Sequence, residues 1–454
     1  MKQQFFLLSL LGALVINLAA CDGPINPQPV PKYDTTFVYT YDTTISPVER
    51  IDTIGMDTLV QDTLIPLDND YVVCSYIAYY GSKWPLPQYL THAIYSCAEL
   101  YVVDNVYQKI GLHLTSGKDQ KRFIKFTQLK EKNPDLKLMV SVAHVCDLPD
   151  NAQGGSFSAL SKDTMMRRQF ALDCIAMCEE YNLDGIDINW ELPGVSESGA
   201  AADVTCDTEN FTKLVRDMRS VFNEKGHPEY LITYAGHNRN KEAVDGGYRF
   251  MDLSKIGPYI SWANVMCYGL DQAPLPQNAL FCTAAYHDIN SVYQSYKKAG
   301  FSMSQFVLGC PFYTRPPKDD TSIKGEWYYS TIVDQIKNYP KLYRFNYNHR
   351  HDWGVPYVEK NVNGTWKMYG SIEDSTSLYR KAQYVRDRGM HGIMWWENEG
   401  DDSKHTLQKA AWNALKSEIR HDTTFLPITD TIPAMDTLII THCDTIITKK
   451  DKRK

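Results

Sequence analysis

Short runs of apolar residues recur along the central part of the chain, and segments with helical spacing of apolar residues lie between most of them. Eight runs of strand length occur, at residues 71–77, 92–98, 136–142, 183–191, 230–234, 260–268, 306–313 and 392–397. The helical segments include residues 118–131, 165–181, 209–225, 288–299 and 376–388. Strands that alternate with helices are typical of a parallel sheet. Eight such units predict a (β/α)8 TIM barrel, in which catalytic groups lie at the carboxyl ends of the strands.

The fourth run has one apolar and one polar face. The apolar face comprises Ile186, Ile188 and Trp190, and the polar face comprises Asp187, Asn189 and Glu191. Successive side chains of a strand point to opposite sides, and a charge buried without partners costs several kcal/mol. The polar row is therefore expected to line a cavity in which its members bond one another and a ligand. The alternative is an edge strand with a solvated polar face.

The connection between the seventh and eighth runs is unusually long. Residues 316–372 separate these runs, and they include Trp327, Trp353 and Trp366. We expect this segment to form a small inserted lobe that walls one side of a cleft.

The segments outside the barrel share a repeated Asp-Thr unit. It occurs five times within residues 21–70 and four times within residues 419–454, always followed by Thr, Ile or Leu. Such low-complexity sequence predicts extended tails outside the catalytic fold, which we place at residues 71–418. The unit also resembles the O-glycosylation acceptor of exported bacterial proteins, and glycans would keep a tether solvated. An unmodified linker is the alternative.

The first residues have the pattern of an export signal. Met1 and Lys2 precede an apolar stretch, so residues 1–20 predict a signal peptide rather than a spanning helix. Cys21 directly after Leu-Ala-Ala resembles a bacterial lipoprotein processing site, which implies a lipidated Cys21 as the mature N-terminus. An ordinary signal peptide is the alternative. We expect an exported protein that is anchored by lipid to a bacterial membrane, at the outer membrane or cell surface.

Composition narrows the class of protein only slightly. Of 454 residues, 43% are hydrophobic and 22% are charged, which is typical of a globular protein with a large core. The formal net charge of −7 is mild and argues against a nucleic-acid partner. Aromatic residues, at 12%, suit a cleft in which sugars stack, and they suit an ordinary core as well.

The eleven cysteines do not predict a disulfide framework. Several fall inside expected buried strands, where thiols behave as small apolar groups: Cys74, Cys97, Cys267 and Cys310. Cys174 and Cys178 lie four apart on an expected helix, but no His or Cys pair at zinc-site spacing accompanies them. We therefore expect core packing and no bound metal. Cys146 and Cys206 form one conceivable bridge between loops.

Five motifs in barrel order resemble those of family-18 glycoside hydrolases, the family of chitinases and endo-β-N-acetylglucosaminidases. The fourth-strand pattern of that family is Asp-Gly-x-Asp-x-Asp-x-Glu, and residues 184–191 read Asp-Gly-Ile-Asp-Ile-Asn-Trp-Glu. The other motifs are Leu-Thr-His at 90–92 with Tyr95, Met-Cys-Tyr at 266–268, Gly-Cys-Pro-Phe-Tyr at 309–313 and Gly-Ile-Met-Trp-Trp-Glu at 392–397. The resemblance spans the whole barrel and implies a glycosidase.

Three positions depart from the family pattern. The third acidic position is Asn189, and Gly269 follows Tyr268 where the family has Asp. The third strand ends Ser-Val-Ala-His at residues 141–144, where the family has Ser-x-Gly-Gly. Each difference changes the floor of the subsite that would hold the reacting sugar.

The resemblance implies that the 2-acetamido oxygen of the substrate attacks the anomeric carbon, unlike the two-carboxylate mechanism of most retaining glycosidases. Glu191 would be the general acid and later the general base, and Asp187 would keep it protonated near neutral pH. Asn189 would accept the acetamide N–H without supplying charge. The residues implied in substrate binding are Tyr268 on the acetamido carbonyl, Trp396 under the sugar ring, Met266, Tyr313 and Ser141. No cofactor is implied.

Functions of different classes remain open. The first is hydrolysis of β-1,4-linked N-acetylglucosamine glycans, such as chitin or the chitobiose core of N-glycans, by a monomeric enzyme. Loss of a preorganised electrostatic partner at position 189 would cost about 3 kcal/mol, yet the separate family-85 endo-β-N-acetylglucosaminidases resemble this pairing of Asn with Glu. The second is glycan binding on a barrel that has lost activity, which the departures favour and the retained Glu191 disfavours. A purely structural surface protein is the third.

Overall fold

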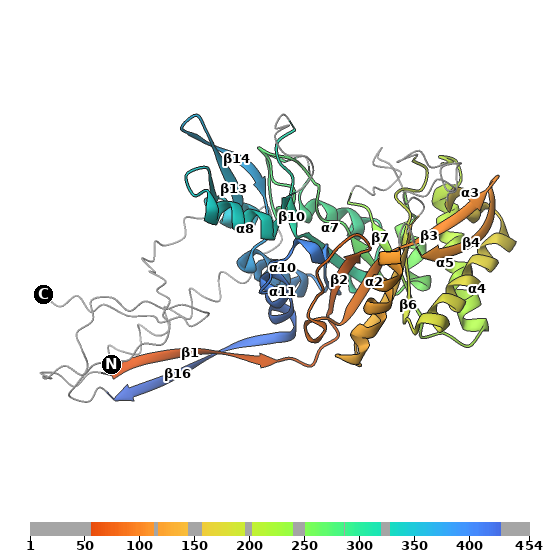
Figure 1. Cartoon of the computed structure of the whole chain (residues 1–454), viewed down its shortest axis with the longest axis horizontal. Coiled ribbons are helices and arrows are strands. Elements are labelled where there is room, and N and C mark those ends of the chain that lie inside the picture. Colours follow the sequence, from red (N-terminus) through yellow and green to blue (C-terminus); the bar gives the residue numbers. More distant parts are fainter. Residues whose placement is uncertain are drawn as a thin grey trace, which may run out of the picture. The chain divides into compact units, whose positions relative to one another are not determined.

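Eight parallel strands form a closed ring in the computed structural model, which describes residues 56–112, 117–143, 157–195, 202–238, 250–285, 287–318 and 327–427. The strands of the ring are β2 (Val72–Ala78), β3 (His92–Val103), β5 (Lys137–Ala143), β6 (Gly185–Asn189), β7 (Leu231–Gly236), β8 (Trp262–Val265), β9 (Phe306–Pro311) and β15 (Gly392–Trp396). Each pairs with the next, and β2 pairs with both β3 and β15, which closes the ring (Figure 1). The predicted (β/α)8 barrel is confirmed.

Each expected run overlaps one of these strands, but β6, β8, β9 and β15 end before their runs do. β6 ends at Asn189, so Glu191 lies just beyond the strand. β8 ends at Val265, so Met266 and Tyr268 also lie beyond it. These residues therefore belong to the loops at the carboxyl end of the barrel.

The sequence pattern does not predict one hairpin. β3 is longer than its run and continues to Val103, and β4 (Val106–Leu112) returns antiparallel to it. The turn consists of Asp104 and Asn105, with φ of 50° and 62°. Two consecutive residues with positive φ are typical of a type I′ hairpin turn, for which Asp and Asn are well suited.

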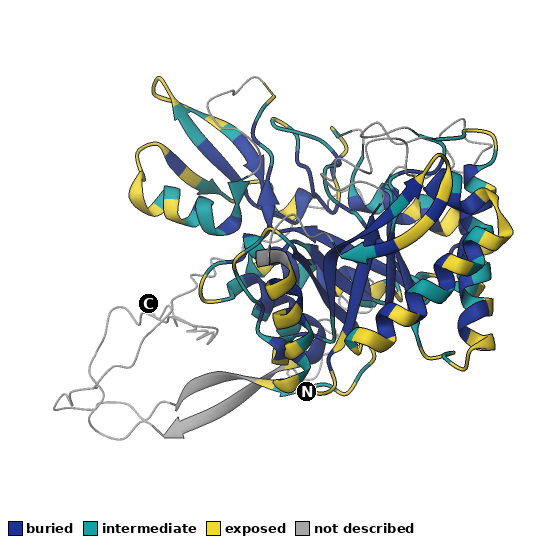
Figure 2. Cartoon of the chain, turned by 45° about the vertical axis from the view of Figure 1, so that its right-hand side comes forward, coloured by how far each residue is buried: buried dark blue, intermediate teal, exposed yellow. Residues whose placement is uncertain are grey.

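Helices form the outer layer of the barrel. They are α2 (Gly117–Thr127), α3 (Phe157–Lys162), α4 (Thr164–Tyr181), α5 (Asp207–Glu224), α6 (Leu253–Ile256), α7 (Ile289–Lys298), α10 (Ser375–Asp387) and α11 (Thr406–Lys416). Short 3-10 helices are η1 (Pro87–Tyr89), η2 (Gln128–Glu131), η5 (Gly257–Tyr259), η6 (Met303–Gln305) and η7 (Asn398–Gly400). Figure 2 shows buried strands inside and helices whose outer faces are exposed. This one-sided burial explains the helical spacing of their apolar residues.

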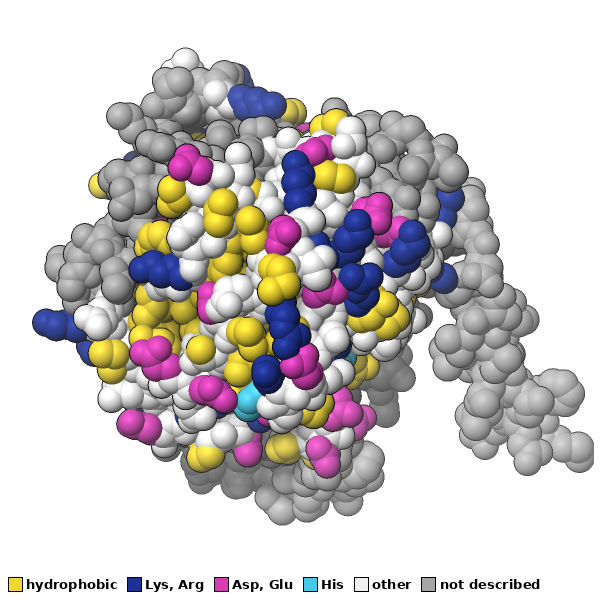
Figure 3. All heavy atoms as spheres, turned by 90° about the vertical axis from the view of Figure 1, so that its right-hand side faces the viewer, with side chains coloured by type: hydrophobic (Ala, Val, Ile, Leu, Met, Phe, Trp, Pro, Cys, Tyr) yellow, Lys and Arg dark blue, Asp and Glu magenta, His cyan; other side chains and the backbone are white. Residues whose placement is uncertain are grey.

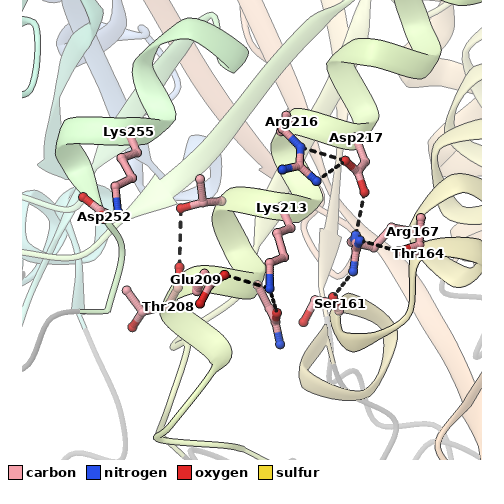
Figure 4. Close-up of polar contacts among 12 residues, drawn as sticks. Ser161, Thr164, Arg167, Thr208, Glu209, Lys213, Arg216, Asp217, Asp252 and Lys255 are labelled. Atoms are coloured by element: carbon pink, nitrogen blue, oxygen red, sulfur yellow. Dashed lines mark hydrogen bonds and ion pairs between the residues drawn. The ribbon is translucent and has the colours of Figure 1, made fainter.

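Polar contacts join neighbouring helices of the outer layer. Arg167 of α4 donates through Nε to Oδ2 of Asp217 of α5 at 2.7 Å, and through Nη1 to the Ser161 carbonyl at 2.6 Å (Figure 4). Lys213 pairs with Glu209 one turn earlier on α5 at 2.9 Å, an exposed pair worth a few tenths of a kcal/mol. On the face over these helices, acidic and basic side chains are interspersed with apolar ones (Figure 3).

The two faces of β6 have different neighbours, as its alternation predicts. Trp190 follows the strand, is 3% exposed and stacks on Phe157 of α3 with 5.5 Å between ring centroids. Ile186 and Ile188 belong to the same core cluster, which fills the space between strands and helices. Asp187 points to the opposite side, into the barrel. A second apolar cluster lies there, formed by Val72, Cys74, Tyr76, Ile94, Met139, Trp262, Val307 and Met394.

The described residues between β9 and α10 form a small lobe, in agreement with the predicted insertion. Its elements are β10 (Tyr313–Thr314), β11 (Trp327–Tyr328), α8 (Tyr329–Asn338), β12 (Tyr343–Asn346), α9 (Arg350–Trp353), β13 (Tyr357–Val362) and β14 (Thr365–Ser371). β12, β13 and β14 form an antiparallel sheet, and β10 pairs with β11. Trp327 packs against Tyr343 and Tyr369, at 5.3 and 5.0 Å between ring centroids. An aromatic core of its own therefore supports the lobe.

The described cysteines are free thiols, and most of them are buried. Cys174 and Cys178 are fully buried in the main core, as expected for packing residues. Cys206 is a free thiol, and its conceivable partner Cys146 lies outside the described residues. Within the described parts of the chain, no group of three or more metal-ligating side chains occurs. The same parts contain no helix that is both long and apolar enough to span a membrane.

Parts of the two tails pair with each other. β1 (Met56–Pro66) and β16 (Ser417–Pro427) form a two-stranded sheet. These strands contain three of the Asp-Thr units, at residues 57–58, 62–63 and 422–423. The predicted signal peptide, Cys21 and the remaining units lie outside the described residues. The strands fit the β-branched composition of the repeated unit.

Candidate active site

A pocket of about 280 Å³ lies at the carboxyl end of the barrel. Its lining comes from the carboxyl-terminal parts of strands and from the residues that follow them: Tyr76, Asn189, Glu191, Ala235, Asn264, Met266, Tyr268, Tyr313, Arg315, Met394 and Trp396. This end of a (β/α)8 barrel is where its loops build ligand sites.

Most of the residues that the sequence assigns to catalysis or binding meet in this pocket. They are Asn189, Glu191, Met266, Tyr268, Tyr313 and Trp396. The other two, Asp187 and Ser141, are fully buried and are not part of the lining. Both lie two residues before the ends of their paired strands, one layer deeper than Asn189. Ser141 therefore bonds Asp187, at 2.8 Å, instead of facing the space that a sugar would fill.

The Asp187 carboxylate accepts four hydrogen bonds from four other strands. The donors are Tyr76 Oη at 3.0 Å, Ser141 Oγ at 2.8 Å, Thr233 Oγ1 at 2.6 Å and Asn264 Nδ2 at 3.2 Å. Burial raises the pKa of Asp187, and these hydrogen bonds oppose that shift by stabilising the ionised form. Four donors also fill the acceptor positions of a carboxylate. Asp187 can therefore act on a ligand through its charge and through the groups that it holds in place.

Glu191 and Asn189 reach the pocket because of the alternation along β6. Asn189 is the last residue of the strand and Glu191 lies two positions later, so both side chains project to the same side as Asp187. Both are partly exposed, whereas Asp187 is completely buried. Trp190 between them is anchored in the outer core, which fixes the backbone that carries both groups.

Aromatic side chains form the walls of the pocket. The Trp396 ring lies 5.6 Å from the Tyr76 ring, and the Tyr268 ring lies edge-on to Tyr313 at 6.1 Å, measured between centroids. Asn238 donates through Nδ2 to the Tyr268 carbonyl at 2.7 Å and so holds the loop after β8. Apolar ring faces beside a carboxyl, an amide and a phenol suit a sugar ring that carries polar substituents.

A comparison with known protein families identifies the family to which this barrel belongs. The model of glycosyl hydrolases family 18 matches residues 72–401. The chain belongs to this family. It is therefore a member of a family of glycosyl hydrolases.

The family-18 chain is similar to several chitinases at low identity. It is 26% identical over 341 residues to Chitinase A1 of Niallia circulans, which covers 68% of this chain and 46% of that protein. It is 25% identical over 351 residues to Chitotriosidase-1 of Mus musculus, covering 70% of this chain and 68% of that protein. The crystal structure of chitinase ChiW from Paenibacillus sp. str. FPU-7 has a TM-score of 0.63 at 24% identity and covers 76% of this chain and 33% of that one. The chain thus spans less than half of Chitinase A1 and a third of ChiW.

Five lining residues of this family-18 pocket are missing from the sequence-based assignment. They are Tyr76, Ala235, Asn264, Met394 and Arg315. Asn264 gives a signal, because a polar residue inside a short apolar strand needs a partner, and it donates to Asp187. Arg315 lies two residues after Tyr313, just beyond β10, and both side chains line the pocket. Tyr76, Ala235 and Met394 look like ordinary core residues in the sequence.

A buried carboxyl joins the lobe to the rim of the barrel. Glu397 is 1% exposed and accepts hydrogen bonds from Tyr328 Oη of β11 at 2.8 Å and from the Ala78 backbone N–H at 3.3 Å. Burial raises the pKa of Glu397, against the effect of these hydrogen bonds. The residue follows Trp396 directly, so the same contacts position the tryptophan of the pocket.

Proposed function

We propose that this chain hydrolyses β-1,4-linked N-acetylglucosamine glycans by a retaining, endo-type mechanism in which the acetamide of the substrate takes part. The observation that carries the proposal is the meeting of Glu191, Asn189, Tyr268 and Trp396 in one pocket above a buried Asp187. The family membership supports the reaction class.

The reaction begins with the sugar ring on Trp396 and its acetamide between Asn189 and Tyr268. Glu191 donates its proton to the glycosidic oxygen, the bond from that oxygen to the anomeric carbon breaks, and the acetamido oxygen bonds to that carbon. The product is an oxazolinium ion, while the shortened glycan leaves with the proton. Glu191, now ionised, takes a proton from a water molecule, whose oxygen bonds to the anomeric carbon as the bond between that carbon and the acetamido oxygen breaks. Two displacements at one carbon retain its configuration.

Asp187 supports this reaction from below. The oxazolinium ion is positively charged, and a carboxylate already fixed by four donors stabilises it without rearrangement. Asn189 contributes an acceptor for the acetamide N–H but no charge. The electrostatic support for the ion therefore comes mainly from Asp187.

The second candidate is a glycan-binding protein with weak or absent turnover. Asn189 favours it, because loss of a preorganised charge partner typically lowers a rate by a hundredfold or more. Tyr268 and Trp396 would serve binding as well as catalysis.

Product analysis separates the two candidates. Wild type, Glu191→Gln and Asn189→Asp are compared on chitooligosaccharides and on high-mannose glycopeptides. We expect hydrolysis by wild type, a loss of about 10²–10⁴-fold in Glu191→Gln, and a faster rate or a shifted pH profile in Asn189→Asp. Binding without turnover in wild type, unaffected by Glu191→Gln, would establish the binding function instead.

We also propose that the protein is exported and anchored through a lipid on Cys21, with glycans on its Asp-Thr units. The signal-like residues 1–20 and the repeated unit support this. Intact-mass measurement of the exported protein, with Cys21→Ser as control, tests both modifications. A single unmodified mass in wild type removes them.

A further inference from the structure

The loop that carries Glu191 is fastened on both sides of that residue. On the amino side, Trp190 stacks on Phe157 of α3, with 5.5 Å between ring centroids and 18° between ring planes. On the carboxyl side, the Gly194 backbone N–H donates to Oδ2 of Asp207 at 3.1 Å. Asp207 is the first residue of α5 and is completely buried. The position of Glu191 therefore depends on two contacts with the outer layer of helices.

Asp207 accepts from three donors with its two carboxylate oxygens. Besides Gly194, the Asp203 backbone N–H donates to Oδ2 at 2.7 Å, and Ser158 Oγ donates to Oδ1 at 2.6 Å. A carboxylate is favoured at this place, because the N-terminus of a helix carries a partial positive charge. Ser158 is 2% exposed and follows Phe157 directly in α3. Both contacts that fasten the loop thus lead to adjacent residues of one helix.

The connection between Glu191 and its anchor is short and stiff. Gly194 follows Glu191 after only two residues, and the second of these, Pro193, has a fixed φ. Gly194 has a φ of +76°, a conformation that glycine adopts without strain. A displacement of Gly194 would therefore move the backbone of Glu191 instead of being absorbed along a long loop. The hydrogen bond to Asp207 prevents that displacement.

We infer that Asp207 is a positioning residue for the general acid: its buried carboxylate fixes the loop from which Glu191 presents its proton to the glycosidic oxygen. A general acid must lie within hydrogen-bond reach of the atom that it protonates, and a displacement of about 1 Å can lower a rate by about a hundredfold. Asp207 is not among the residues that line the pocket, so it acts through the loop and not on the substrate. This inference rests on the proposed function, because it concerns the proton donor of that reaction.

Two substrates with different leaving groups distinguish a misplaced acid from a generally damaged enzyme. Asp207→Asn has nearly the same size, but its amide offers one acceptor oxygen where the carboxylate uses two. Rates are measured on chitotetraose, whose leaving sugar needs a proton, and on a dinitrophenyl chitobioside, whose leaving phenolate does not. We expect kcat on chitotetraose to fall by about 10–100-fold with KM within about twofold, and kcat on the aryl glycoside to stay within about threefold of wild type.

Amide hydrogen exchange tests the same inference without turnover. In peptides that span residues 191–195, Asp207→Asn should exchange faster by about tenfold, because the Gly194 N–H loses its acceptor and the loop opens more often. Ser158→Ala removes only the hydrogen bond to Oδ1 and leaves the two backbone donors on Oδ2. It should therefore give a smaller increase in exchange and a smaller loss of kcat on chitotetraose.

Asp217→Asn is the matched control. Asp217 lies later on the same helix and accepts from Arg167 Nε at 2.7 Å and from Arg216 Nη2 at 2.8 Å, so it joins helices of the outer layer (Figure 4). Its substitution should weaken that layer without changing exchange at residues 191–195 or the ratio of the two rates. Thermal melts confirm that each variant is folded.

The possible outcomes separate this inference from the proposed function. Equal losses of kcat on the two substrates in Asp207→Asn would overturn the inference, as would exchange at residues 191–195 that matches wild type. The same pattern of losses in Asp217→Asn would overturn it too. If wild type hydrolyses neither compound, the proposed function is overturned, and the exchange measurement still decides whether Asp207 fixes the loop.

Discussion

The two ends of the barrel differ in chemistry although the same strands run through both. At the amino end, His92 packs edge-on against Trp262 with 4.7 Å between ring centroids, and Val72 is buried nearby in the interior cluster. Burial lowers the pKa of His92 to about 3, so its ring is neutral. At the carboxyl end, Asp187 is buried with four donors and the interior opens into a pocket. The amino end contributes packing, and the carboxyl end holds polar groups in position.

One hydrogen-bonded chain connects the two ends. Trp262 Nε1 donates to Oδ1 of Asn264 at 2.9 Å, and Asn264 Nδ2 donates to Oδ1 of Asp187 at 3.2 Å. Asn264 therefore relates the packing layer to the polar layer. Substitutions at the amino end should change mainly stability, and substitutions at the carboxyl end should change mainly activity. Residues of this hydrogen-bonded chain are the exception, because they belong to both layers.

The largest expected effect is at the amino end. Trp262→Ala should lower the free energy of unfolding by about 3–5 kcal/mol, because it opens a cavity in the barrel interior. Urea unfolding measures the change. Trp262→Phe is the control that keeps most of the volume but removes the N–H donor to Asn264, and it should cost less. An equal cost for both variants would mean that the hydrogen bond, not the packing, matters at this end.

Asp187→Ala should affect stability and activity together. It leaves four donors without their acceptor, so we expect a loss of about 3 kcal/mol in the free energy of unfolding and a loss of turnover. Asp184, just before the same strand, is the matched control. It accepts from the Leu138 N–H at 2.7 Å and pairs with Lys130, so Asp184→Ala should cost about 1 kcal/mol and leave kcat/KM within about twofold. A large loss of turnover in Asp184→Ala would contradict the division between the ends.

The pH dependence of stability should reveal His92. Its folded-state pKa is lowered to about 3, so the unfolded chain takes up a proton on this residue near pH 6.5 while the folded protein does not. Its contribution is therefore fully present above about pH 6.5 and is lost as the pH falls toward 3, amounting to about 2 kcal/mol between pH 7 and pH 5. Unfolding curves of wild type and His92→Gln at both values measure the difference. If the free energy of unfolding of the two proteins changed in parallel with pH, this explanation would be contradicted.

The smallest effect should come from single donors to Asp187. Tyr76→Phe removes one hydrogen bond to a charged acceptor and should cost about 1.5 kcal/mol of stability. Ser141→Ala removes a donor to the same oxygen and should cost a similar amount. Because both share Oδ2, the double variant should cost more than the sum of the two. Strict additivity would show that the two donors act independently.

The sequence predicts the barrel and most of the pocket because both depend on local alternation. Strand and helix periods identify all eight strands, and the period of two along β6 places Asn189 and Glu191 on one side. Alternation assigns a side chain to a face but not to a depth, so it cannot separate Ser141, one layer below the pocket, from residues that line it. Arg315 is missed because its guanidinium lies where a side chain at Gly269, on a different loop, would be: a Cβ there would be 2.8 Å from Nη1. The hairpin of β3 and β4 is missed although its Asp-Asn turn is a signal.

The donors to Asp187 are also far apart along the chain, with Tyr76 111 residues before it and Asn264 77 residues after it. Loop closure over such distances is entropically costly, so this set of bonds forms only when distant segments have met. During synthesis, all four donors to Asp187 have left the ribosome once residue 264 has emerged. The lobe and the last strands of the ring emerge later. The floor of the pocket is thus encoded in the first part of the polypeptide, and β15 closes the ring around it afterwards.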